Sequence, residues 1–191
     1  MSDAVVASGV VAATVFGFGA QNRAMLSAGA ARAIRPVIDG MIASISGWLL
    51  LFALALSGLH LLPGWVSSLA MVSASLLLAM AGLSRYLADP GAPKHAPAYS
   101  SASAHPLQNL QSPESWAVAM FLAGSALSGT VTLASAFVGL TLLSAFGLSL
   151  WAIAGWSGCQ YLSSGWHRRH LDWAIGILMF VAAIASLVPG A

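Results

Sequence analysis

The sequence predicts an all-α transmembrane protein, a six-helix bundle, and two observations lead to this fold class. First, 59% of the 191 residues are hydrophobic and only 6% are charged, whereas soluble domains carry about 25% charged residues to solvate their surface. Second, six apolar stretches approach the length needed to cross the roughly 30 Å hydrocarbon core as helices. We therefore expect lipid to be the solvent and the whole chain, 1–191, to form a single transmembrane domain.

The six expected spans are apolar runs bounded by charged or turn-forming residues. They are residues 4–31, 37–59, 65–87, 113–127, 131–162 and 171–188. The first run carries a polar interruption at residues 19–23, which predicts a broken first helix. Residues 88–112 are rich in Pro and Ser and are expected to be a solvated cytoplasmic linker.

The placement of basic residues predicts the orientation of the spans. All seven Lys and Arg lie in the second half of the first, third or fifth expected span or in the connection that follows it, namely Arg23, Arg32, Arg35, Arg85, Lys94, Arg168 and Arg169. Because Lys and Arg are enriched in cytoplasmic loops, both termini are expected on the opposite side of the membrane. If the first stretch does not cross, five spans with a cytoplasmic N-terminus are the alternative.

The linker leaves three expected spans on each side, in residues 1–87 and 113–191. Because three is an odd number, a duplicated unit of this kind would insert upside down in its second copy. The sequence therefore predicts two inverted three-helix repeats, each of which opens with a polar break. Interrupted hydrophobic segments at corresponding places in two halves are typical of the binding sites of secondary transporters.

Three segments, taken in order, carry a resemblance to a known family. They are Phe18-Gly19-Ala20-Gln21-Asn22 in the first apolar run, Gln111-Ser112-Pro113-Glu114-Ser115-Trp116 after the linker, and the C-terminal hairpin with Arg168-Arg169 before Leu171-Asp172-Trp173. In these segments and in length, span count and linker position, the chain resembles the lysine exporter family, LysE/RhtB, of bacterial amino-acid exporters. Ala20 and Ser112 depart from that family's Pro and Asn.

The resemblance implies a proton-coupled secondary transporter in the bacterial cytoplasmic (inner) membrane that exports amino acids or similar small solutes. It implies no cofactor. A metal-cation exporter, with His95 and His105 in the linker as a capture loop, is one alternative. A non-transporting membrane scaffold subunit is another. The glycine-rich helix faces also permit a homodimer.

The polar break supplies the first group of expected substrate-binding residues, Gly19, Gln21, Asn22 and Arg23. Glycine relaxes the backbone, and the two amides offer donors and acceptors at membrane depth. A half-helix that starts here presents unpaired N–H groups and the positive end of its dipole to a substrate carboxylate. The alternative is the cytoplasmic end of the first span, where the amides meet headgroups and Arg23 extends to the interface.

Asp39, Ser112 and Pro113 complete the expected substrate-binding set. Asp39 is the only acid inside the first three spans, so we expect it to carry a proton or bind an amino group. The alternative role for Asp39 is an interfacial ion pair with Arg35. Ser112, Pro113 and Glu114 have the chemistry of a helix start. A substrate role for Ser112 and Pro113 comes from the resemblance.

Other function classes lack their sequence signatures. The basic residues form no stripe that could follow a nucleic-acid backbone. No set of nucleophile, base and acid indicates an enzyme, and no phosphate-binding loop indicates direct use of ATP. His167 and His170 flank Arg168 and Arg169, whose charges would repel a metal ion, so we expect this segment to contact anionic lipid.

Reporter fusions test the predicted topology. Fusions at Lys94 and Arg169 should report the cytoplasm, and fusions at Pro63 and at the C-terminus should report the opposite side, because basic residues are retained in the cytoplasm. A C-terminal fusion that reports the cytoplasm would contradict the six-span arrangement.

Overall fold

The computed structural model describes residues 9–12, 15–16, 20–87, 112–157 and 165–187. Short helical turns cover residues 9–12 and 15–16. The remaining described residues form α2 (Ala20–Ala30), α3 (Ile34–His60), α4 (Gly64–Leu87), α6 (Pro113–Leu127), α7 (Leu133–Trp156) and α8 (Gly165–Leu187). Strands are absent from this part of the chain. The expected all-α class is therefore confirmed.

Three of these helices, α3, α4 and α7, are long and apolar enough to cross a membrane. α8 has a shorter apolar part, Trp173–Leu187. α6 has 15 residues, and at about 1.5 Å rise per residue it reaches only about 22 Å. α7 ends at Trp156, earlier than the expected end at residue 162. The described residues thus show three of the six expected spans.

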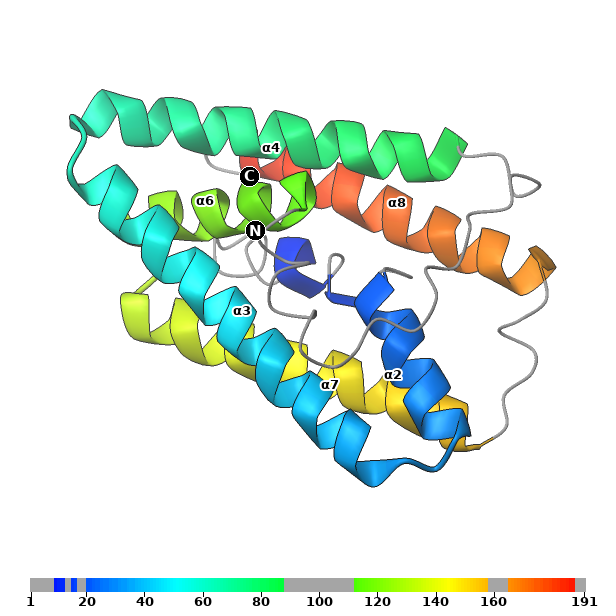
Figure 1. The fold of residues 1–191 in the computed structure, drawn as a ribbon. Coiled ribbons are helices and arrows are strands. Elements are labelled where there is room, and N and C mark those ends of the chain that lie inside the picture. The colour runs from blue at the N-terminus through cyan, green and yellow to red at the C-terminus, as the bar shows by residue number, and fades with distance from the viewer. Residues whose placement is uncertain (1–8, 13–14, 17–19, 88–111, 158–164, 188–191) are drawn as a thin grey trace.

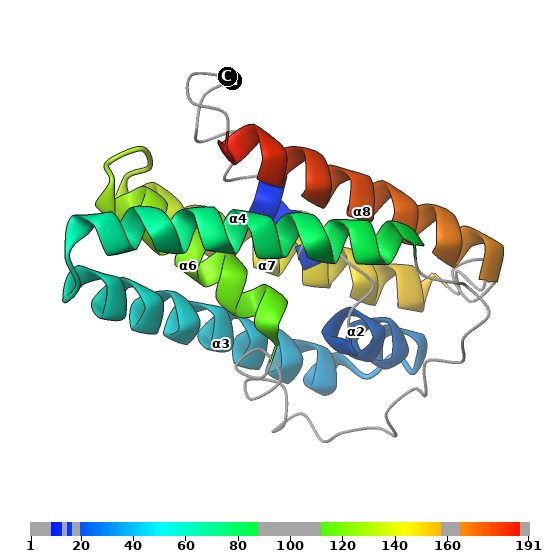
Figure 2. The ribbon, with the colours of Figure 1, turned by 90° about the horizontal axis from the view of Figure 1, so that it is seen from above.

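α6 lies inside the bundle, where it packs against α3 and α4 (Figures 1 and 2). Its buried residues surround the helix, among them Val118, Phe121 and Leu122. A helix that is apolar on every side requires apolar neighbours on every side. The core of the fold therefore forms around this short helix.

α4 and α8 run antiparallel and cross at two glycines (Figure 1). A Cβ built on Gly82 would lie 2.6 Å from the carbonyl oxygen of Gly176 and 2.9 Å from the backbone nitrogen of Phe180. A Cβ on Gly176 would lie 2.7 Å from the carbonyl oxygen of Gly82 and 3.1 Å from the nitrogen of Tyr86. The contact is reciprocal, because each glycine meets the other and the residue one turn beyond it.

α3 and α7 bury faces that match at a separation of 100 residues. The buried positions shared by the two helices are 40, 44, 47, 48, 51, 52 and 55 of α3 and the same numbers plus 100 of α7. Ser44 and Gly47 recur as Ser144 and Gly147. Ser149 also contacts Met41 across the two helices.

The helices that precede α3 and α7 end in the same way. At the end of α2, Ala33 donates to the carbonyl of Ala28 and Arg32 to that of Gly29. At the end of α6, Thr130 donates to Ser125 and Gly129 to Ala126. Both closures are Schellman motifs with a left-handed residue, Arg32 (φ 55°) or Gly129 (φ 75°).

Four of the described basic residues lie at helix ends on one side of the molecule. The C-terminal ends of α2 and α4 and the N-terminal ends of α3 and α8 lie in the right half of Figures 1 and 2. These ends carry Arg32, Arg35, Arg85 and Arg169. The expected grouping of positive charge on one side agrees with this arrangement.

Alanine at Gly82 tests the close contact between α4 and α8. The added methyl group meets backbone atoms that cannot move without separating the helices, so we expect Gly82→Ala to lower the free energy of unfolding by about 1–3 kcal/mol. Gly139→Ala on α7 is the matched control, because nothing lies within 4 Å of its Cβ position. That variant should be unchanged or stabilised by up to about 1 kcal/mol. Unfolding of the detergent-solubilised protein measures both, and equal effects would contradict the reciprocal contact.

Candidate substrate site at the helix break

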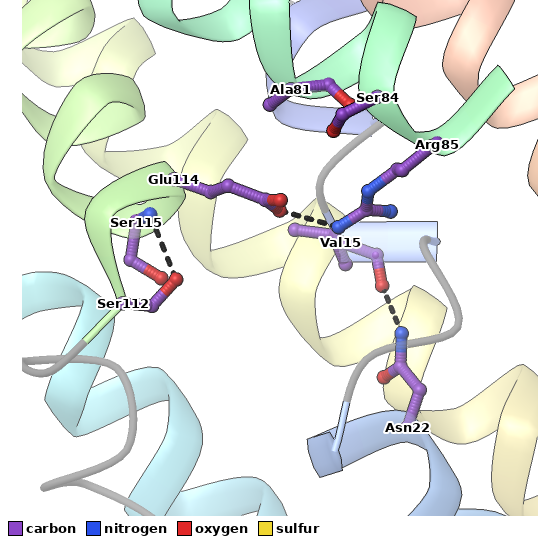
Figure 3. A network of polar contacts seen from close by, with 8 residues as sticks. All are labelled: Val15, Asn22, Ala81, Ser84, Arg85, Ser112, Glu114 and Ser115. Carbon is purple, nitrogen blue, oxygen red and sulfur yellow. Dashed lines mark hydrogen bonds and ion pairs between the residues drawn. The ribbon is translucent and has the colours of Figure 1, made fainter. Parts of the chain in front are cut away.

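α2 begins where the first apolar run is interrupted. The buried side chain of Asn22 donates through Nδ2 to the carbonyl oxygen of Val15, seven residues earlier (Figure 3). In a continuous helix these residues would lie about 10 Å apart along the axis, out of reach of an Asn side chain. Residues 15–16 and α2 therefore do not form one continuous regular helix, and Asn22 satisfies the carbonyl of Val15. Gly19, in the predicted polar interruption, lies outside the described residues.

Packing against α7 holds the turn before the break in place. A Cβ on Gly147 would meet the side chain of Val15 at 2.6 Å and that of Phe16 at 3.5 Å. The ring of Phe16 also packs edge-on against Phe146, with 6.1 Å between the ring centroids. Gly147 therefore leaves the space in which this turn lies against α7.

Two buried polar atoms near the break have no hydrogen-bond partner among the described residues. They are Nε2 of Gln21, in the first turn of α2, and Oγ of Ser144, one turn before Gly147 on α7. A serine inside a helix normally bonds back to the carbonyl of the preceding turn. An unsatisfied buried donor costs about 1–3 kcal/mol, so each atom gains stability if a ligand or water bonds to it.

An ion pair joins α4 to α6. Nη2 of Arg85 donates to Oε2 of Glu114, and the two side chains are 19% and 34% exposed. Glu114 lies in the first turn of α6, which Ser112 caps by accepting from the backbone nitrogen of Ser115 at 3.4 Å. Figure 3 shows this pair and the Asn22–Val15 bond together, with the Val15 turn between them in that view. The first turn of α6 and the first turn of α2 each supply polar groups of the candidate site.

The residues expected from the sequence to bind substrate lie in different surroundings. Gln21, Asn22 and Arg23 share the first turn of α2, and Arg23 is half-buried. Ser112 and Pro113 are the N-cap and first residue of α6, so their helix-start chemistry is confirmed.

The other two expected residues are not placed at the site. Gly19 lies outside the described residues. The side chain of Asp39 is exposed on α3, and the ion pair found within the described ranges does not include it.

The sequence predicts Arg85 as a basic residue of the cytoplasmic connection and Glu114 as a helix-start acid, and it does not predict that the two side chains pair. The available signal was the position of Arg85 inside the third apolar run, before that run ends at Leu87. A charge within a span usually has a partner.

The metal-cation alternative finds no site in the described residues, where no three His, Cys, Asp or Glu side chains group together. His95, His105 and the side chain of His167 lie outside them. Comparison with protein-family models, curated proteins and solved structures found no match. The LysE/RhtB resemblance therefore stays a hypothesis drawn from the sequence.

A double-mutant cycle tests the ion pair. Arg85→Gln and Glu114→Gln should each destabilise the protein, and the double variant should lose less than the sum, with a coupling energy of about 1–2 kcal/mol. Arg35→Gln combined with Glu114→Gln is the control, and its effects should add. Unfolding in detergent gives all the values. Additive effects for Arg85 and Glu114 would mean that the two side chains do not interact.

Proposed function

We propose that this chain is a multi-pass membrane protein built from two inverted repeats, and that it works as a secondary transporter that exports amino acids or similar small solutes. Its membrane is the bacterial cytoplasmic membrane, with the basic end in the cytoplasm. The half-buried Arg85–Glu114 pair carries the proposal. A charged pair inside an apolar bundle is costly and usually functional.

The correspondence between the two halves supports the inverted repeats. α4 and α8 meet reciprocally at Gly82 and Gly176, as two copies related by a twofold axis would. α3 and α7 match at a separation of 100 residues and follow helices with the same closure. In transporters of this kind, the substrate binds at the interface of the repeats, beside discontinuous helices. The break before α2 and the short α6 are the discontinuous helices here.

The ion pair suits a zwitterionic substrate. An amino acid carries a carboxylate and an ammonium group, the same two charges as Glu114 and Arg85. When the pair opens, Arg85 binds the substrate carboxylate in a bidentate manner, and Glu114 binds the ammonium group. Asn22 acts as a positioning residue, because its amide already bonds to Val15.

Glu114 is also the proposed proton carrier, in place of the exposed Asp39. Protonation of Glu114 removes one charge of the pair, which weakens its hold on Arg85 and on a bound ammonium group. Proton binding from the outer side therefore favours substrate release, as exchange requires. The coupling needs Glu114 to face the two sides alternately, as in rocking of one repeat against the other.

Efflux from liposomes tests the proposed function. Purified protein in liposomes loaded with a mixture of labelled amino acids should release at least one of them, and a proton gradient should accelerate release. Glu114→Gln should lower efflux about tenfold or more, the effect of losing about 1.4 kcal/mol of binding. Ser46→Ala, at an exposed site on α3, is the control and should transport normally.

The controls separate the alternatives. A thermal melt of each variant shows whether lost efflux reflects lost folding. If folded wild-type protein releases no amino acid, the proposed transport is wrong and the scaffold alternative stands. Release of Zn²⁺ or Ni²⁺ in parallel liposomes, without release of amino acids, would favour the metal-cation exporter.

A further inference from the structure

A narrow apolar groove follows the crossing of α4 and α8 on the outside of the bundle. Its volume is about 270 Å³, and its lining is Gly82, Leu83, Tyr86, Gly176, Ile177 and Phe180. The glycines are buried and form the floor, and the four larger side chains are between 40% and 50% exposed. In a membrane crossed by α4, which is long and apolar enough to span one, this groove would face acyl chains.

A basic and aromatic cluster closes the groove at the end where the positive charges gather. Tyr86 lines the groove and also packs against Trp173, with 5.6 Å between ring centroids. The guanidinium carbon of Arg169 lies 4.6 Å from the centre of the Trp173 ring. His170 packs edge-on against the same ring at 5.6 Å. Trp173 thus connects the apolar groove to two exposed side chains, the cationic Arg169 and the titratable His170.

We propose that this groove binds one anionic phospholipid of the cytoplasmic leaflet. An acyl chain lies along the glycine floor between Leu83 and Phe180, and the phosphate reaches Arg169. Stacking on Trp173 occupies the face of the guanidinium, while its N–H edge pairs with phosphate oxygens. Basic pockets between helices on the cytoplasmic side are a known way to recognise lipid headgroups.

The order of side chains along α8 matches the order of parts in a phospholipid. Arg169 and His170 come first, Trp173 follows at the level where indole rings favour the membrane interface, and Ile177 and Phe180 come next on the apolar side. Arg85, the neighbour of Tyr86, is directed to Glu114 inside the bundle. The groove therefore takes its charge from α8. The lipid site requires only that α4 and α8 lie in the membrane, and it does not depend on transport.

Native mass spectrometry of the full-length protein in detergent tests the site. The probes are phosphatidylglycerol and phosphatidylcholine with the same acyl chains, and soluble glycerol 3-phosphate. Wild-type protein should retain one phosphatidylglycerol in preference to phosphatidylcholine and should not retain glycerol 3-phosphate. Arg169→Gln should reduce the preference about fivefold, the contribution of one basic residue near an anionic lipid. Arg35→Gln, an exposed arginine on α3 at the same end, should leave it unchanged.

A groove-filling variant tests the position of the acyl chain. Ile177→Trp places a larger side chain in the groove and should abolish retention of both lipids. Leu178→Trp is the matched control, because Leu178 is exposed on the same helix but does not line the groove. Melts of both variants show that they fold.

Four results would overturn the proposal. They are equal retention of the two lipids by wild-type protein, binding of glycerol 3-phosphate alone, equal loss in Arg35→Gln and Arg169→Gln, and unchanged lipid retention in folded Ile177→Trp. If Ile177→Trp instead converts a dimer to a monomer and leaves lipid retention intact, a second copy of the chain occupies the groove.

Discussion

The close approach of α4 and α8 at Gly82 and Gly176 is the constraint on which the rest of the structure depends. Neither position has room for a Cβ, so the two backbones lie in direct contact. The next residues of α4 are placed by that contact. Arg85 is directed inward to Glu114, while Tyr86, about 100° further round the helix, lines the outer groove. One crossing thus positions both the proposed substrate site and the proposed lipid site.

Inside the bundle, polar groups take the place of the backbone hydrogen bonds that a continuous helix would make. Asn22 bonds to the carbonyl of Val15, and Ser112 caps the start of α6. In an apolar medium each such group must find a partner, so these bonds make the broken helix and the short helix possible. The break leaves Gln21 with a buried amide that has no partner in the described ranges. A polar ligand could accept a hydrogen bond from this amide.

Much of the fold could be predicted from the sequence because membrane helices show as long apolar runs. The expected fourth span, residues 113–127, coincides with α6, and the expected third span agrees with α4 to within one residue. From its apolar composition alone, the segment 113–127 was expected to cross the whole membrane, but α6 is too short for that. Apolar composition marks a helix that avoids water, but it does not tell a lipid-facing helix from one surrounded by other helices. Most of α6 is buried against other helices, and only a narrow stripe that includes Met120 and Leu127 is exposed, so a short helix suffices.

The sequence by itself determined the helical class and the presence of helices long and apolar enough to span a membrane, because both follow from local composition. Only the tertiary structure decided which polar groups meet. Arg85 and Glu114 are 29 residues apart, and they face each other because α4 and α6 pack with a particular rotation about their axes. That rotation is set by packing between helices distant in the sequence, such as the contact of Gly124 on α6 with Met71 on α4. The helical pattern of one segment does not specify it.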